Sequence, residues 1–375
     1  MTDEVWMARA LQLAEKGLCT TSPNPRVGCV IVRDGEIVGE GWHQQAGGPH
    51  AEVHALRMAG DKARGATAYV TLEPCSHHGR TPPCAGALIA AGVKRVVGAV
   101  EDANPQVAGQ GFALLRDAGI DVTSGCLRDQ AWALNEGFML RMSRGRPLVR
   151  LKLAMSIDGR TAMASGESQW ITGPEARRDV QRMRARSCAV ITGANSVMLD
   201  DPSMNVRFRE AGLDIPETLQ RQPLRVLIDG RERIGSDARL FHVSGDILIA
   251  GRQPRIKPIE RAENMGQTHY WHASQSGDQV DLEGLLRHLG NRGCNEVLVE
   301  TGANLAGAFI AAGLVDELVI FCAPTLLGSE ARPLLSLGLS QMNQQLRWHW
   351  QDVRMTGNDL RMTLRPVKAE AGKGR

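Results

Sequence analysis

Two short strings near the N-terminus constrain the fold of the first half of this chain more than any other feature. PHAE (49–52) opens a helix-like segment, Cys75 directly follows a strand-like one, and Cys84 opens a second helix-like segment after an interval of eight residues. If His50, Cys75 and Cys84 bind one metal ion, two helices must begin at the same end of a sheet. That is where α/β proteins place their sites.

The donor set favours a catalytic zinc ion. One imidazole and two thiolates leave the fourth tetrahedral position open for water. The metal lowers the pKa of that water, and the Glu52 carboxylate, two residues from His50, is placed to take the proton. H-x-E followed by P-C-x-x-C is typical of zinc deaminases. The interval between Cys75 and Cys84 is longer than in that pattern.

A closed structural zinc site is the alternative interpretation of these residues. His54, His77 or His78 would then supply the fourth ligand. A closed site requires neither the glutamate nor the proline before the first cysteine, so the sequence favours the open site. His54, four residues after His50, is then expected to be a packed or hydrogen-bonded neighbour.

Strand and helix signals alternate through both halves of the chain. In the first half we expect a hairpin over 27–43 with its turn at Asp34-Gly35. Further strands are expected at 66–72, 94–100 and 120–125, and helices at 51–60, 84–92 and 111–119. This order predicts an α/β domain with helices on both faces of its sheet.

A chain of 375 residues exceeds what one core usually supports, so we expect two domains. SRGRP (143–147) predicts the junction, which gives a first domain over 1–145, a second over 146–367 and a disordered tail over 368–375. In the second domain the pattern predicts strands at 148–156, 187–193, 224–230, 245–251, 295–302 and 315–324, helices at 174–186 and 303–313, and a final antiparallel pair.

Composition excludes several classes of protein. No apolar run approaches the roughly 20 residues that span a bilayer, and the N-terminal segment does not resemble a secretory signal, so we expect no membrane association and a cytoplasmic location. The eight cysteines then form no disulfides. A net charge of +3 argues against nucleic acid as a partner. The arginines at 177, 178, 182, 184 and 186 are either a solvated helix face or an anion site.

The second dense motif lies in the second domain. Residues 152–173 contain a strand, an Asp-Gly turn and a Gly/Ser-rich loop, and residues 299–313 contain a strand, a glycine-bearing turn and a helix. The backbone N–H groups at such a helix start favour phosphate. The glycines do not form G-x-G-x-x-G, so the usual dinucleotide-binding fold is not indicated, and each is equally compatible with simple turn geometry.

Several strings together resemble one family. TSPNPRVGCVIV, GEGWH, GGPHAEVHAL, TLEPCSHHGRTPPC and NPQVAGQGF are similar to the deaminase half of the bifunctional deaminase–reductases of riboflavin biosynthesis, and the second half resembles the reductase. In that family the eight-residue interval is the rule. Ala103 stands where the family usually has proline. The resemblance implies an N-terminal cytidine-deaminase-like three-layer α/β/α domain and a C-terminal dihydrofolate-reductase-like α/β domain.

For the deaminase half, the resemblance implies one zinc ion on His50, Cys75 and Cys84, with Glu52 moving protons. The implied substrate is 2,5-diamino-6-ribosylamino-4(3H)-pyrimidinone 5′-phosphate, a small phosphorylated pyrimidine. Asn24 either contacts substrate or forms a turn between two prolines. The loop between the cysteines either contacts the ring or the phosphate or is merely exposed, and its candidates are His77, His78, Arg80 and Thr81.

For the reductase half, the resemblance implies NADPH and reduction of the ribosyl group to ribityl. It places the cofactor near Ala154, Trp170, Thr172, Ser196, Asp200, Gly302, Ala303, Asn304, Leu305, Ala306, Gly307 and Ala308. It places the substrate near Ser168, Arg184, Met204, Arg207 and Glu300. Arginines suit a 5′-phosphate because they bind it bidentately. Lys152 is either an assistant or an ordinary strand lysine, and Trp170 either a ring contact or part of the core.

Three hypotheses follow for the whole chain. The first is the bifunctional enzyme, which by resemblance and base rate forms a homodimer. The second is a deaminase of tRNA or nucleosides with an accessory domain, against which stands the lack of a mixed basic and aromatic surface. The third is a zinc-stabilised scaffold without catalytic activity.

Overall fold

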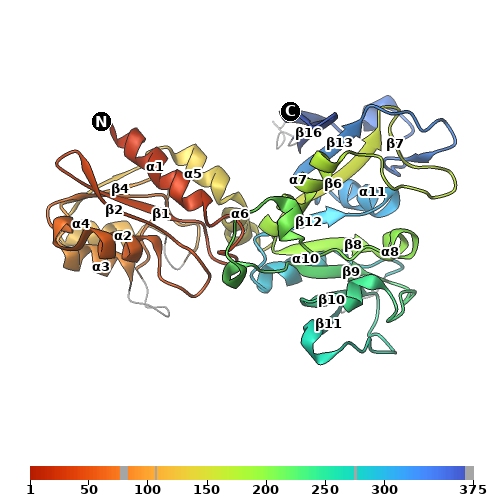
Figure 1. Ribbon diagram of the computed structural model, residues 1–375, viewed down its shortest axis with the longest axis horizontal. Helices are drawn as coiled ribbons and strands as arrows, with labels where there is room; N and C mark the ends of the chain where they lie inside the picture. Colours follow the sequence, from red (N-terminus) through yellow and green to blue (C-terminus); the bar gives the residue numbers. More distant parts are fainter. Residues whose placement is uncertain (77–82, 106–107, 274–276, 368–375) are drawn as a thin grey trace, which may run out of the picture. The chain divides into compact units, whose positions relative to one another are not determined.

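The computed structural model describes residues 1–76, 83–105, 108–273 and 277–367 (Figure 1). The expected tail and the loop residues 77–82 lie outside the described residues. The chain forms two compact units, Met1–Arg146 with Glu217–Gln220 and Gly293–Asn295, and the remainder from Pro147 onward. Among the described residues, no helix combines the length and the apolar character needed to cross a membrane.

The first unit is built on a five-stranded sheet with the order β2-β1-β3-β4-β5. The strands are β1 (Gly28–Arg33), β2 (Glu36–Trp42), β3 (Thr67–Val70), β4 (Arg95–Gly98) and β5 (Asp121–Ser124). β1 pairs antiparallel with β2 and β3, whereas β3, β4 and β5 run parallel. The expected hairpin is confirmed, and Asp34 and Gly35 have the positive φ angles, 53° and 79°, that such a turn requires.

Helices cover both faces of this sheet, as predicted (Figure 1). The unit contains α1 (Asp3–Glu15), α2 (Ala51–Ala59), α3 (Cys84–Ala91), α4 (Gln110–Asp117), α5 (Arg128–Leu134) and α6 (Glu136–Arg144). Side chains alternate between two cores along β1, since Cys29 and Ile31 pack with α2, α3 and α4, whereas Val30 and Val32 pack with α1, α5 and α6. The three-layer α/β/α prediction is therefore confirmed.

The second unit is built on a nine-stranded sheet with the order β11-β10-β9-β8-β12-β6-β13-β16-β15. Its strands are β6 (Leu148–Ser156), β8 (Ala189–Gly193), β9 (Leu224–Ile228), β10 (Ile247–Gly251), β11 (Thr268–His272), β12 (Glu296–Glu300), β13 (Glu317–Ala323), β15 (Trp348–Thr356) and β16 (Asp359–Pro366). All neighbours run parallel except β13–β16 and β16–β15, which confirms the expected final antiparallel pair. β7 (Arg160–Ala162) and β14 (Arg332–Pro333) form a separate two-stranded sheet.

The helices of the second unit are α7 (Pro174–Arg186), α8 (Ala194–Asp200), α9 (Phe208–Ala211), α10 (Leu282–Asn291) and α11 (Ala303–Ala311). Across both units, short 3-10 helices lie at Gly60–Ala63, Glu217–Leu219, Arg239–His242, Glu263–Met265 and Met342–Gln344. Val180 and Met183 of α7 pack against Leu298 of β12 and Phe321 of β13. In the parallel part of the sheet, the carboxyl ends of the strands share one edge, which carries the second candidate site.

Candidate functional site

The start of α2 is fixed by its close contact with β2. A Cβ atom on Gly41 would lie 2.4 Å from the Ala51 carbonyl oxygen and 2.6 Å from the Ala55 nitrogen. Only glycine therefore lets the first turn of α2 approach the strand so closely. His50, in extended conformation, immediately precedes this turn. Its imidazole is thus held at the edge of the sheet.

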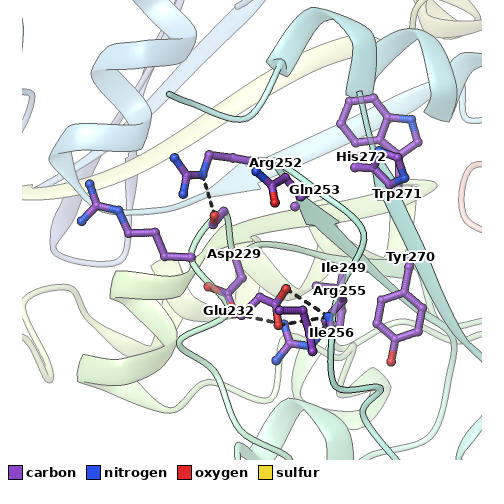
Figure 2. Close-up of a pocket in the computed structure, with 13 residues that line it drawn as sticks. Asp229, Glu232, Ile249, Arg252, Gln253, Arg255, Ile256, Tyr270, Trp271 and His272 are labelled. Atoms are coloured by element: carbon purple, nitrogen blue, oxygen red, sulfur yellow. Dashed lines mark hydrogen bonds and ion pairs between the residues drawn. The ribbon is translucent and has the colours of Figure 1, made fainter. Parts of the chain in front are cut away.

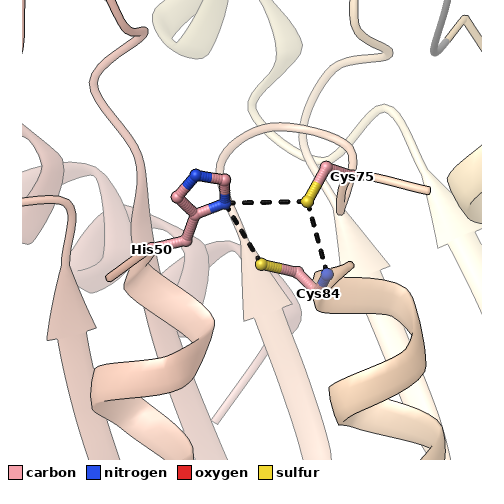
Figure 3. Close-up of side chains that lie close together, drawn as sticks. All are labelled: His50, Cys75 and Cys84. Carbon is pink, nitrogen blue, oxygen red and sulfur yellow. Dashed lines mark hydrogen bonds between the residues drawn. The ribbon is translucent and has the colours of Figure 1, made fainter. Parts of the chain in front are cut away.

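The three predicted metal ligands meet at this edge (Figure 3). His50 Nδ1 lies 3.3 Å from Cys84 Sγ and 3.6 Å from Cys75 Sγ, and the Cys84 backbone N–H donates to Cys75 Sγ over 3.3 Å. The three donor atoms all lie within 4.8 Å of one another. This is a zinc-type donor set, and three protein ligands leave one tetrahedral position for water.

The thiols and the imidazole are already electrostatically coupled. Hydrogen bonds from the Cys84 thiol, His50 and the Cys84 backbone lower the pKa of Cys75 to about 4. The hydrogen bond with the Cys75 thiol, together with burial, raises the pKa of Cys84. The hydrogen bond with Cys75 also raises the pKa of His50. A zinc ion would take both sulfurs as thiolates.

Glu52 lies in the first turn of α2, and its side chain faces the ligands. The residue is 3% exposed, and its carboxyl group is hydrogen-bonded to Cys84. Burial raises the pKa of Glu52, with the nearby His50 opposing the shift. Burial thus favours the protonated form of this carboxyl group.

The described residues give no support to a closed site. His54 is absent from the ligand cluster of the described chain, and its Nε2 is buried without a hydrogen-bond partner there. The other two candidates for a fourth ligand, His77 and His78, lie outside the described residues, as do Arg80 and Thr81. Among the described residues, the cluster therefore consists of three donor atoms.

Sequence reasoning missed two residues that organise the site. His43 is 2% exposed; its Nδ1 lies 3.0 Å from the Pro49 carbonyl oxygen and its Nε2 lies 3.1 Å from the Asn24 amide nitrogen. Its ring packs edge-on against His50, 5.4 Å between centroids. Asn24 is therefore linked to the metal site through His43, which contacts His50.

Glu73, the second missed residue, precedes Pro74-Cys75. Its buried carboxylate accepts backbone N–H groups of Asp102 (3.1 Å), Gly109 (2.9 Å), Gly111 (2.8 Å) and Phe112 (3.3 Å). Glu73 thus ties the segment that ends in Cys75 to the loop before α4. The signal was a charged residue inside an otherwise apolar strand end, TLEPC.

In the second unit, Arg184 and Glu300 form a buried bidentate ion pair. Arg184 Nε and Nη2 lie 2.6 and 2.9 Å from the two Glu300 carboxylate oxygens, and Nη1 donates to the Asn205 carbonyl over 3.0 Å. In the sheet, the backbone of Lys152 in β6 lies opposite the backbone of Glu300 in β12. Burial lowers the pKa of Lys152, and Glu300 partly opposes that shift. Arg184 thus holds Glu300 in place. Arg207 is half exposed and pairs with Glu210 at 2.6 Å, so it is more accessible than Arg184.

Two hydrogen bonds bring other candidate residues together. Ser168 Oγ donates to Asp200 Oδ1 over 2.7 Å, which joins a predicted substrate contact to a predicted cofactor contact. The Gly302 N–H donates to Ser196 Oγ over 3.2 Å, which places the start of α11 beside α8. The first turn of α11 therefore lies next to the carboxyl ends of β8 and β12.

The remaining candidates differ in exposure. Trp170 is 67% exposed with Arg177 over its ring at 4.7 Å, so it is not part of the core, and the Thr172 carbonyl accepts from the same arginine. Met204 is buried and packs against α7. Ala306 and Gly307 are also buried, and a Cβ on Gly307 would lie 2.0 Å from the Ser336 carbonyl oxygen. Of the other candidates, Gly302 and Asn304 are exposed, whereas Ala303, Leu305, Ala308 and, in β6, Ala154 are half-buried.

The arginines of α7 do not gather into one anion site. Arg177 and Arg182 bind backbone carbonyls, and Arg184 and Arg186 bind buried glutamates. Four of the five arginines are therefore committed to the fold.

Comparison with known proteins decides which family has this pair of sites. Residues 1–100 match the cytidine and deoxycytidylate deaminase zinc-binding region, and residues 147–362 match the RibD C-terminal domain. The chain is 52% identical to riboflavin biosynthesis protein RibD of Escherichia coli over 97% of this chain and 99% of that protein, and 50% identical to the Haemophilus influenzae protein over 97% of each.

The chain belongs to the RibD family.

Solved structures agree with this assignment. The RibD structure of Acinetobacter baumannii has a TM-score of 0.90 and 47% identity over 98% of this chain and 99% of that one. A diaminohydroxyphosphoribosylaminopyrimidine deaminase/5-amino-6-(5-phosphoribosylamino)uracil reductase of Thermotoga maritima has a TM-score of 0.84 and 33% identity over 97% and 99%.

Membership of the RibD family confirms the expected combination of activities. The chain is a bifunctional deaminase and reductase of riboflavin biosynthesis, with a zinc-binding deaminase domain and a dihydrofolate-reductase-like reductase domain. The scaffold hypothesis is thereby wrong for this chain.

Proposed function

We propose that residues 1–145 deaminate 2,5-diamino-6-ribosylamino-4(3H)-pyrimidinone 5′-phosphate and that residues 146–367 reduce the product with NADPH to 5-amino-6-ribitylamino-uracil 5′-phosphate. The observation that carries the deaminase half is the convergence of His50, Cys75 and Cys84 beside buried Glu52. Three protein ligands fit one zinc ion per chain.

In the deaminase, zinc would supply a water of lowered pKa for attack on the ring carbon that bears the exocyclic amine. The Glu52 carboxylate accepts the proton of that water and returns it to the departing amine, which leaves as ammonia. Its burial favours the protonated form and keeps bulk water from competing. Asn24, held by His43, offers a polar contact to the ring at the edge of the site.

In the reductase, NADPH would supply hydride to the C=N carbon of the ring-opened ribosyl group. Backbone N–H groups at the start of α11 suit the cofactor pyrophosphate. Glu300, oriented by Arg184, is placed to hold sugar hydroxyls, and Arg207 suits the substrate phosphate because its guanidinium is half exposed. Ser168, Met204 and Asp200 complete the proposed wall between substrate and cofactor.

Replacing the proton carrier tests the deaminase half. Glu52→Gln keeps the shape of the side chain but cannot cycle the proton, so we expect ammonia release to fall by about 10²–10⁴-fold. Zinc content, measured by atomic absorption, should stay at one ion per chain, whereas Cys75→Ser should lose zinc. Ammonia release by Glu52→Gln at the unmodified rate would contradict the proposed role.

A second copy of this chain is the partner we propose. β15 is an edge strand in the described part of the sheet and exposes Trp350 (64%), Val353 (51%) and Met355 (62%). Exposed edges with apolar side chains are usually covered in native proteins. Pairing of β15 with its own copy would cover this face in a homodimer.

A further inference from the structure

The loop between β7 and α7 carries two of the proposed cofactor contacts, Trp170 and Thr172. Earlier in the loop, Ser168 is hydrogen-bonded to Asp200 over 2.7 Å. Arg177 of α7 donates to the Thr172 carbonyl over 2.6 Å and lies 4.7 Å from the centroid of the Trp170 ring, which is 67% exposed. So exposed a ring has little packing to fix it. Its position therefore depends on where the backbone of the loop is attached.

The end of this loop is attached to a buried carboxylate from a distant part of the chain. Asp359, the first residue of β16, is 2% exposed, and its Oδ2 accepts the backbone N–H of Gly173 over 2.7 Å. Gly173 lies between Thr172 and Pro174, where α7 begins. An ionised acceptor strengthens this hydrogen bond, and the positive end of the α7 dipole favours a carboxylate here. Asp359 thus fixes the point at which the loop becomes a helix.

The β15–β16 turn that presents Asp359 is itself packed on α7. Glu175 of α7 lies so close to Gly357 that a Cβ atom on this glycine would be 2.6 Å from Glu175 Oε2. One turn further along α7, Asp179 pairs with Arg361 of β16 over 3.3 Å, and both side chains are largely buried. These contacts keep the hairpin turn against the first half of α7. Asp359 is therefore held in a fixed place beside the loop.

The strand register places Asp359 at the edge of the sheet that carries the proposed cofactor site. β16 runs antiparallel to β13 with Leu360 opposite Cys322, so the start of β16 lies beside the carboxyl end of β13. β13 pairs in turn with β6, where Phe321 lies opposite Ala154, a proposed cofactor contact. Since neighbouring strands are about 4.8 Å apart, Asp359 lies two strands, or about 10 Å, from β6. Asp359 is thus placed to act on the loop and not on the reacting atoms.

Another loop at this edge is held by the same kind of contact, at the pocket drawn in Figure 2. This pocket of about 290 Å³ is lined by Asp229, which directly follows β9 and is 1% exposed. The Asp229 carboxylate accepts the backbone N–H groups of Arg233 (2.9 Å) and Ile234 (3.0 Å), and Arg255 pairs with it over 3.3 Å. Asp229 holds a loop that follows its own strand, whereas Asp359 holds one that lies 186 residues away.

We propose that Asp359 is a positioning residue of the reductase, which holds the loop of Trp170 and Thr172 where the nicotinamide cofactor binds. The proposal rests on the proposed reductase function. Without the Asp359 carboxylate, cofactor binding has to order the loop, which lowers the affinity. Once the cofactor is bound the loop is in place again, so the rate at saturating cofactor is preserved.

Cofactor titration of the zinc-loaded full chain tests this role. By nicotinamide fluorescence, Asp359→Asn, whose amide oxygen is still an acceptor, should weaken NADPH binding about fivefold, and Asp359→Ala about tenfold or more. With the deaminated intermediate as substrate, the KM for NADPH should rise by the same factors while kcat stays within about twofold of the parent value.

The matched control is Asp246→Asn. The Asp246 carboxylate accepts the Gln267 N–H over 2.9 Å at the amino ends of β10 and β11, the opposite edge of the sheet. Its replacement removes the same kind of contact and should change neither the affinity for NADPH nor the KM. A merely structural role of Asp359 would lower the thermal stability of both variants and leave the KM of both unchanged.

Limited digestion with chymotrypsin measures the loop without turnover, because Trp170 is an exposed aromatic target. Cleavage after Trp170, identified by mass spectrometry, should be faster in Asp359→Asn than in the parent and in Asp246→Asn, and saturating NADPH should slow it. If Asp359→Ala does not fold, Asp359→Asn alone decides.

An affinity of Asp359→Asn for NADPH within about twofold of the parent, or an equal loss in Asp246→Asn, would overturn the positioning role. Cleavage after Trp170 at the parent rate in Asp359→Asn would overturn it too. Failure of the parent chain to bind NADPH would instead overturn the reductase proposal on which the role rests.

Discussion

The pKa values of the buried carboxyl groups of Glu52 and Glu300 shift in opposite directions. Burial raises the pKa of Glu52, and among the described residues no arginine donates a hydrogen bond that would offset this shift. This carboxyl group can therefore carry a proton. Burial also acts on Glu300, but the charge and hydrogen bonds of Arg184 outweigh it and lower the pKa. Glu300 therefore stays ionised and serves as a fixed acceptor.

The Arg184–Glu300 pair predicts a pH dependence of stability. Since the folded-state pKa of Glu300 lies below its ordinary value of 4.5, its contribution is present above about pH 4.5 and is lost as pH falls through the lower, folded value. Glu300→Gln leaves Arg184 buried without a counter-charge and should cost about 3–5 kcal/mol at pH 7. Urea unfolding at pH 7 and pH 4 should show a smaller difference between variant and parent at the lower pH.

The matched control is Glu283→Gln, which breaks an exposed pair on α10 and should cost less than about 1 kcal/mol. Equal costs for the buried and the exposed pair would contradict this account.

Residue roles were predictable from sequence only where chemistry restricts the side chain. An H-x-E string with two cysteines has few functions, so these residues were the candidate ligands and proton carrier even though the interval between the cysteines is longer than in the general pattern. Glu73 and His43 act through backbone partners that are distant in sequence, such as Gly111 and Pro49, and no local pattern reports such contacts. Sequence placed Arg184 among the candidate phosphate contacts but could not report its ion pair with Glu300, which is 116 residues away.

At the scale of elements, periodicity predicted the long and strongly patterned segments best. α7 has the bounds expected from its sequence, and most strands of the second sheet lie within one to three residues of their expected ends. The patterns gave no prediction for α5, α6, α10 or β11. Helices this short contribute little propensity of their own, and they form because tertiary packing buries residues such as Ala131 and Leu286.

Close packing of α2 on β2 makes a prediction at this scale. Gly41→Ala would push the Ala51–Ala55 turn away from the strand, because the new Cβ meets backbone atoms at 2.4–2.6 Å. We expect a loss of about 1–3 kcal/mol in stability together with weaker zinc binding, since His50 moves with the helix. Chelator competition and thermal unfolding measure the two effects.

Gly86→Ala, whose Cβ would meet only the Pro83 ring at 3.7 Å, should bind zinc normally and is the control. If both variants bind zinc equally well, the glycine contact does not position the ligand.

At the scale of the whole molecule, the two units carry separate cores and separate sites. The sequence predicted two domains because 375 residues exceed what one core usually supports, and SRGRP (143–147) predicted the junction. It could not predict the order of the nine-stranded sheet, in which β6 lies between β12 and β13, since strand order depends on pairings between distant segments.

The exposed face of β15 makes a prediction about assembly. Val353→Asp places a charge in the centre of the proposed contact and should convert the dimer to a monomer in sedimentation velocity. Met58→Asp changes another exposed apolar residue, in α2, and should leave the assembly as it is. A dimer that survives Val353→Asp unchanged would place the interface elsewhere.

The most direct test of the account is the stoichiometry of the two reactions in one chain. With 2,5-diamino-6-ribosylamino-4(3H)-pyrimidinone 5′-phosphate, the purified zinc-loaded protein should release one ammonia for each NADPH oxidised. Glu52→Gln should lose both signals from this substrate yet still oxidise NADPH when the deaminated intermediate is supplied. NADPH oxidation by Glu52→Gln at the full rate from the diamino substrate would contradict the assignment of deamination to the His50, Cys75 and Cys84 site.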